Sequence, residues 1–189
     1  MAGFPIHELR GRRSVDLTIE QRYETLERIF VHQFFELYRI LGRRFGWHVA
    51  NEIAMEVPNS SVPLIVEGYR RKFGLGGEGA ALLCQVLQAE FQAEGSDVDV
   101  LVETADDATF EVECAFGAAL TSGRYDDVEI APGLCHEGCA GWMGRVGRTL
   151  DPPVRAERTA WMGEGAARCR FALRRAGLDA AEDDAPANH

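Results

Sequence analysis

Four of the five cysteines of this 189-residue chain lie in its C-terminal half: Cys114, Cys135, Cys139 and Cys169. A thiol acts as a nucleophile once it is deprotonated, and it is also a ligand of soft metals. Cys135 and Cys139 are four residues apart, so a helix through them carries both on one face. Cys114 and Cys169 border strand-like runs with alternating apolar residues. We therefore expect the four sulfurs to converge on one buried surface, here called the cysteine cluster.

The first chemistry open to this cluster is nucleophilic catalysis. The start of a helix near Cys135 offers unpaired backbone N–H groups that stabilise a thiolate, and Cys114 is the second candidate nucleophile. His136 and Glu137 follow Cys135 directly and are the candidates for proton transfer. A catalytic set of Cys135, Cys114, His136 and Glu137 requires no cofactor.

The second chemistry is ligation of a zinc ion or an iron–sulfur cluster by Cys114, Cys135, Cys139 and Cys169. The spacing Cys-x-x-x-Cys with two distant single partners differs from the paired Cys-x-x-Cys of zinc knuckles. A third interpretation is a thiol-rich core, because free cysteine packs as a small apolar residue. Cys84 lies in an apolar helical pattern and is assigned to the core.

A glycine-rich segment over residues 74–79 satisfies G-x-G-x-x-G. The dinucleotide-binding motif requires a strand before its first glycine, whereas residues 69–73 resemble the basic end of a helix. We predict a turn between two helices here.

The composition is that of one compact globular domain, with 46% hydrophobic and 26% charged residues. A formal charge of -10 repels nucleic acid and anionic membranes, so neither is an expected partner. No apolar stretch approaches the ~20 residues of a membrane span, and the first residues lack a secretion signal. We expect a cytoplasmic chain with reduced thiols and a small molecule as its partner.

The elements that would position the cysteine cluster divide at residue 95. Residues 17–95 predict helices, starting from a capping box at Thr18. The expected helices run from 19 to Gly42 or Gly46, from 47 to 57 where Pro58 ends the helix, from Ser60 or Ser61 to 73, and from 80 to 93. The first helix carries an aromatic stripe, which belongs either to the core or to a homo-oligomer interface: Phe30, Phe34, Phe35 and Tyr38.

Residues 96–176 predict the order β-β-α-β-β, with hairpins over 98–114 and 154–174 and a helix over about 133–150. The fold class is therefore α+β, with N-terminal helices packed against an antiparallel-sheet half. Residues 1–16 predict a flexible arm, and residues 177–189 a disordered acidic tail.

The C-terminal half resembles the L-2-amino-thiazoline-4-carboxylic acid hydrolase family over about residues 98–175. The resemblance is carried by Val112-Glu113-Cys114-Ala115-Phe116, Leu134-Cys135, the run 153–165 and Cys169-Arg170-Phe171. It implies a small α+β domain that opens a cyclic C=N bond by hydrolysis, with family cysteines matching Cys114, Cys135 and Cys169. The Cys-x-Phe ending also resembles small-molecule-binding domains of the 4-vinyl-reductase type.

These observations give two functional expectations. The first is a cysteine-dependent hydrolase of a small thiazoline-like substrate. The alternative is a binding or sensor domain whose cysteine cluster holds a small molecule, a metal ion or an iron–sulfur cluster.

Overall fold

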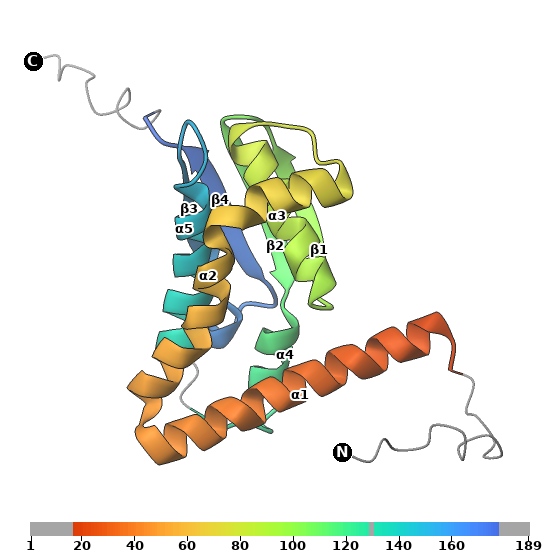
Figure 1. Cartoon of the computed structure of the whole chain (residues 1–189), viewed down its shortest axis with the longest axis vertical. Coiled ribbons are helices and arrows are strands. Elements are labelled where there is room, and N and C mark those ends of the chain that lie inside the picture. The colour runs from red at the N-terminus through yellow and green to blue at the C-terminus, as the bar shows by residue number, and fades with distance from the viewer. Residues whose placement is uncertain (1–16, 129–130, 178–189) are drawn as a thin grey trace, which may run out of the picture.

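The chain has an α+β fold, as the sequence predicts: N-terminal helices and a four-stranded antiparallel sheet with interspersed helices (Figure 1). The computed structural model describes residues 17–128 and 131–177, so the expected arm at 1–16 and nearly all of the acidic tail lie outside the described residues. The elements are α1 (Ile19–Phe45), α2 (Trp47–Phe73), α3 (Gly79–Ala93), β1 (Asp97–Glu103), β2 (Asp107–Glu113), α4 (Ala115–Thr121), the π-helix η2 (Ala131–Ala140), α5 (Gly141–Gly147), β3 (Val154–Ala160), the 3-10 turn η3 (Met162–Glu164) and β4 (Cys169–Arg175).

Helix α1 begins at the predicted capping box. The Thr18 side chain accepts a hydrogen bond from the backbone N–H of Gln21, and the Gln21 side chain accepts one from the backbone of Thr18. Gly46, with φ of 89°, separates α1 from α2. Phe35 and Tyr38 are fully buried, so most of the predicted aromatic stripe serves the core.

The expected break at Pro58 is wrong, because α2 runs unbroken through Pro58 and Pro63. Proline removes a backbone donor, so the helix needs other partners for its carbonyl groups. The indole Nε1 of Trp142 donates to the Pro58 carbonyl at 3.0 Å, and the Ser61 hydroxyl donates to the same oxygen at 2.7 Å. These two hydrogen bonds tie the proline-containing part of α2 to α5 and to its own next turn, whereas the carbonyls that the two prolines leave without an N–H donor are those of Ala54 and Asn59.

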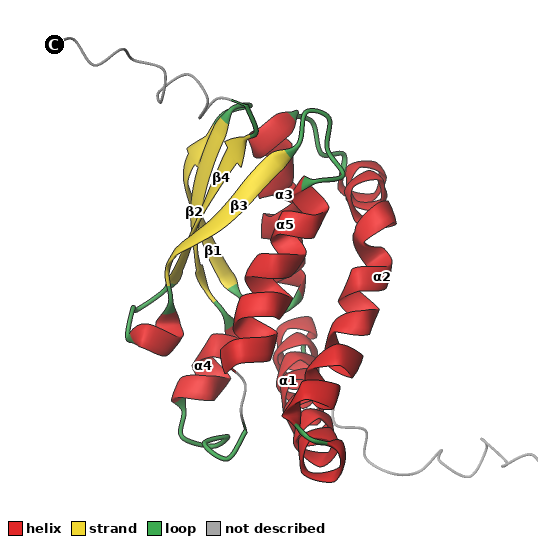
Figure 2. Ribbon diagram, turned by 90° about the vertical axis from the view of Figure 1, so that its left-hand side faces the viewer, coloured by secondary structure: helices red, strands yellow, loops and turns green. Residues whose placement is uncertain are grey.

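The strands lie in the order β1-β2-β4-β3. Each predicted hairpin forms, and the pairing of β2 with β4 joins the two hairpins into one sheet. Helices α3 and α5 cover one face with α2 behind them, and no helix of the described residues covers the other face, here called the open face (Figure 2). Charged pairs cross the open face, among them Arg170 with Glu111, which lie opposite each other on β4 and β2.

Two further expectations differ from the structure. A bulge between Val100 and Val102 shifts the register of β1, so Val102 is exposed instead of sharing the buried side of the hairpin. The helix expected over 133–150 is composed of the wider π-helix η2 followed by the short α5. Helix α4, directly after β2, has no counterpart in the prediction.

The hydrophobic interior has two parts. The sheet core lies between the sheet and helices α3 and α5, and it is centred on the stacked rings of Phe110 and Phe171. The helical core lies between α1, α2 and α4 and is centred on Phe35, which stacks on Tyr125. Leu134 of η2 packs against both cores, so η2 lies along the boundary between them.

Helix α5 lies very close to the sheet at Gly147. A Cβ atom at this position would lie 2.2 Å from the Val154 carbonyl oxygen and 3.2 Å from Leu83. We expect Gly147→Ala to lower the free energy of unfolding by about 2 kcal/mol or more. The Val154 carbonyl belongs to the backbone of β3, so it cannot move away from the new methyl group as the end of a flexible side chain could. Urea denaturation measures the change.

Gly144→Ala, three residues earlier on the same helix, is the matched control. The nearest atom to its Cβ would be the Arg148 Nη1, at 3.7 Å, which is ordinary contact. Here the helix preference for alanine should raise stability by about 0.5 to 1 kcal/mol. Equal effects of the two substitutions would contradict the close approach at Gly147.

Candidate functional site: the cysteine cluster

Cys114 and Cys169 are neighbours because β2 pairs with β4. Cys169 is the first residue of β4, where it pairs with Val112 of β2 and is buried in the sheet core. Cys114 follows the last residue of β2 and is the N-cap of α4. The backbone N–H of Met162 donates to the Cys169 sulfur at 3.5 Å. The end of β2 and the start of β4 thus bring two thiols to the same end of the sheet.

Cys135 and Cys139 approach from the other side, on η2. Cys139 packs against the sheet core and Cys135 against the helical core. A π-helix has wider turns than an α-helix and often occurs at functional sites. The thiols of Cys114, Cys135 and Cys169 each raise the pKa of Cys139, so the four cysteines lie in one region of the structure.

Burial makes this cluster a poor environment for a thiolate. Loss of solvent raises the pKa of Cys139 well above its ordinary value, and the neighbouring thiols and Glu94 raise it further. Burial also raises the pKa of Cys114 to about 11, although the backbone N–H groups of Gly117 and Phe116 act in the opposite direction. Both thiols are therefore protonated at neutral pH.

Cys135 differs from its neighbours because a positive charge lies beside it. Burial raises its pKa, and the Arg158 guanidinium and the Trp161 indole N–H oppose that rise. Arg158 donates from Nη1 to the Cys135 carbonyl oxygen at 3.0 Å, and its guanidinium carbon lies 4.7 Å from the centre of the Trp161 ring. This group ties η2 to β3 at the cluster.

Glu94, at the C-terminal end of α3, is the acidic group of the site. Burial, with the charge of Glu90 as the second cause, raises the pKa of Glu94 to about 7. Its charge contributes to the raised pKa of Cys114 and of Cys139, so Glu94 lies in the same region as the cluster. Glu90 itself accepts a hydrogen bond from the Tyr69 hydroxyl, whose pKa burial and the two glutamates raise.

Sequence reasoning did not select Glu94, Arg158 or Trp161. Alternation along β3 puts Arg158 on the same side as the buried Val154, which is a signal that could have identified it. Trp161 follows β3 directly, within the segment that carries the family resemblance. Glu94 had no such signal, because an acidic residue at a helix end is ordinarily solvated.

Two predictions on this site stay predictions. The side chains of His136 and Glu137 lie outside the described residues, so the proposed proton transfer has no geometry to support it. Among the residues that the structure does describe, no three His, Cys, Asp or Glu side chains are placed to hold one metal ion. The metal-binding alternative therefore gains no support from the structure. Cys84 is buried in α3, as expected, and its pKa is raised by burial to about 12.

Comparison with known proteins finds similarity at the level of solved structures. No protein-family profile matches the chain, and no curated protein is similar to it in sequence. The fold is similar to that of the phenol-responsive sensory domain of the transcription activator PoxR, solved with phenol, with a TM-score of 0.54. The match covers 81% of this chain and 79% of that chain at 17% sequence identity, so it shows a shared fold. In the part of the chain that the structure covers, no helix is long and apolar enough to cross a membrane.

The raised pKa of Glu94 predicts a pH-dependent stability. A carboxyl group whose pKa is higher in the folded chain binds a proton more tightly there, so stability is lost as the pH rises from about 4.5 through about 7. Glu94→Gln, which is neutral at every pH, should remove this loss and raise the free energy of unfolding at pH 8 by about 1 kcal/mol or more. Urea unfolding at pH 5 and pH 8 measures it.

Glu56→Gln is the control, since Glu56 is exposed on α2. It should leave the difference between the two pH values unchanged. A Glu94→Gln protein that keeps the pH dependence of the natural chain would show that Glu94 is solvated.

Proposed function

We propose that this chain is a sensory domain that binds a small, weakly polar molecule beside the cysteine cluster. The observation that carries the proposal is the likeness of fold to the PoxR domain over four fifths of both chains. PoxR's domain is phenol-responsive, and an aromatic alcohol is the ligand class that we carry over to this chain. Fold alone does not fix a ligand, so the chemistry of the cluster must support the same conclusion.

The cluster suits such a molecule because its thiols are buried or half-buried, and because burial raises the pKa of Cys114, Cys135 and Cys139, which keeps these thiols protonated. A protonated thiol is a soft, weakly polar surface that packs against an aromatic ring. Leu134, Phe116 and Met162 add apolar surface close to the cysteines. Two polar groups also face this region, the carboxyl group of Glu94 and the guanidinium of Arg158. Mostly apolar surroundings with few polar groups are typical of small-molecule sites.

The position of the cluster also supports binding. It lies at the boundary of the sheet core and the helical core, where η2 touches both through Leu134. A ligand at such a boundary can move the sheet core and the helical core apart without disrupting the packing inside either core. Movement of η2 and α4 would then report its presence to the rest of the domain.

The hydrolase expectation remains the second candidate. It needs a thiolate at Cys135 or Cys114 at neutral pH, and burial raises the pKa of both thiols. Of these two thiols, Cys135 has a neighbouring cation, Arg158, that lowers the cost of the thiolate. We therefore place binding before catalysis.

Calorimetric titration of the full chain with phenol tests the proposal. We expect saturable binding with a dissociation constant of about 1 to 100 µM, which is within reach of so small a ligand. Arg158→Met should weaken binding by about tenfold, or about 1.4 kcal/mol, because η2 loses its hydrogen bond to β3 and Trp161 loses its cationic neighbour.

Arg174→Met is the matched control, since Arg174 lies on the open face of the sheet beside Asp107. It should bind phenol like the natural chain. Absence of saturable binding to phenol and to its alkylated and halogenated relatives would overturn the proposal. Ring opening of a thiazoline carboxylate that Cys135→Ser abolishes would establish the second candidate instead.

A further inference from the structure

Helix α1 has a second apolar face that the described part of the domain leaves largely exposed. Its buried side holds Phe35, Tyr38 and Gly42, all directed at the helical core. A surface helix normally has polar residues opposite such a side. Here the opposite side carries residues that recur at alternating steps of four and three, which we call the outer stripe: Ile19, Tyr23, Leu26, Phe30, Gln33, Leu37 and Ile40.

All seven side chains of the outer stripe are exposed, among them Ile19 at 80% and Leu26 at 65%. Within the described residues, Tyr23 and Phe30 also contact the domain, yet both stay about half exposed, at 46% and 51%. From Ile19 to Ile40 the stripe is about 33 Å long and roughly 10 Å wide. An apolar strip of that size marks an interaction surface in soluble proteins.

The spacing of the stripe identifies the kind of partner. Alternating steps of four and three are the heptad repeat of a coiled coil, in which the apolar residues of one helix fill holes in a second helix. Ile19, Leu26, Gln33 and Ile40 recur every seven residues, with Tyr23, Phe30 and Leu37 between them. A flat or irregular partner surface would not require this regularity.

We propose that α1 pairs with α1 of a second copy of this chain, in parallel, along the outer stripe. In a parallel pair Gln33 meets the partner's Gln33, and the two side-chain amides can satisfy each other. In an antiparallel pair, the alignment that overlaps the most residues of the outer stripe places Gln33 against the partner's Phe30. The same alignment places Arg22 beside the partner's Arg43. That arrangement leaves an amide buried against a ring and two like charges together.

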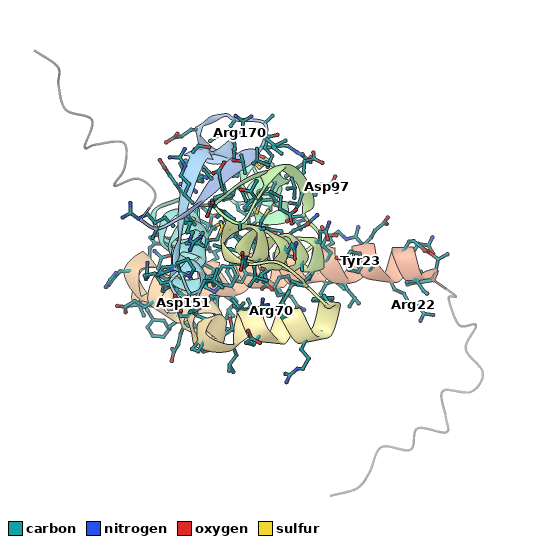
Figure 3. All side chains as sticks on the ribbon, turned by 90° about the horizontal axis from the view of Figure 1, so that it is seen from above. Arg22, Tyr23, Arg70, Asp97, Asp151 and Arg170 are labelled. Atoms are coloured by element: carbon teal, nitrogen blue, oxygen red, sulfur yellow. The ribbon has the colours of Figure 1, made fainter. Side chains whose placement is uncertain are left out.

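The shape of the molecule permits this pairing. Figure 1 shows α1 along one edge of the molecule, with the rest of the fold on one side of it only. In Figure 3 the N-terminal part of α1 that carries Arg22 extends past the rest of the fold, while Tyr23 lies closer to it. The Tyr23 hydroxyl donates to the Gln92 carbonyl at 2.7 Å, and the Phe30 ring meets Phe116 edge-on at 6.0 Å. These contacts hold α1 in place, so pairing requires little further ordering.

The pairing does not depend on the proposed ligand. It differs from the aromatic interface considered from the sequence, because two of those four aromatic residues are buried and Phe34 is partly buried. Net charge of -10 also disfavours an anionic membrane as the partner of the stripe.

Sedimentation equilibrium of the full chain at about 20 µM tests the proposal. We expect twice the 20.9 kDa mass of one chain. The double substitution Leu26→Glu/Leu37→Glu places like charges in two layers and should raise the dissociation constant at least about 100-fold, giving a monomer. Both residues are exposed, so circular dichroism should show an unchanged fold.

Leu64→Glu is the matched control, because Leu64 is an equally exposed leucine on α2, at 73%. It should leave the dimer intact. Ile40→Cys tests the orientation, since only in a parallel pair does residue 40 meet its own copy, and mild oxidation should then give a disulfide-linked dimer that the natural chain does not form.

Two results would overturn the inference. One is a natural chain that stays monomeric at about 100 µM, and the other is a dimer that survives both glutamate substitutions. A dimer in which Ile40→Cys does not cross-link would overturn the parallel arrangement.

Discussion

The backbone pairing of β2 with β4 is the constraint on which the site depends. Each hairpin forms from residues close in sequence, but only this ladder, from Asp107 with Arg174 to Val112 with Cys169, joins the two hairpins. It sets Cys169 beside the end of β2 and so beside Cys114. It also gives α5 a continuous sheet to cover, and α5 in turn fixes the end of η2 with its two cysteines. Without that ladder the four thiols would belong to separate units.

Once the thiols are gathered, desolvation decides what they can do. A nucleophilic cysteine needs neighbours that favour the thiolate, such as a helix N-terminus or a cation. The backbone N–H groups at the start of α4 supply part of this for Cys114, and Arg158 does so for Cys135. In both cases burial is the larger cause, and the pKa is raised. Neutral thiols beside a carboxyl group with a pKa of about 7 form a weakly polar surface, which is why binding is favoured over catalysis.

The sequence predicts local features well, but it does not predict contacts between residues that lie far apart in the chain. The capping box at Thr18 and the two hairpins follow from neighbours in sequence or from alternation, and the structure contains each of them. Pro58 ends a helix on local grounds, but α2 continues through it and is held against α5 there by Trp142, 84 residues away, which donates to the Pro58 carbonyl. Glu94 could not be found in the same way, since only the fold buries it against the cluster.

The aromatic contacts of α4 connect the two proposals. Phe116 lies two residues after Cys114, and its ring packs against three rings of α1. The distances between ring centres are 6.0 Å to Phe30, 5.2 Å to Phe34 and 5.9 Å to Phe35. Phe30 belongs to the outer stripe. A molecule that displaces Cys114 must move the start of α4, and a densely packed ring cluster transmits such a shift because it has no space to absorb it. If a ligand binds beside the cysteine cluster, the side chain of Phe116 is therefore the shortest packed connection from that ligand to the pairing surface of α1, and the two would be coupled through one aromatic residue.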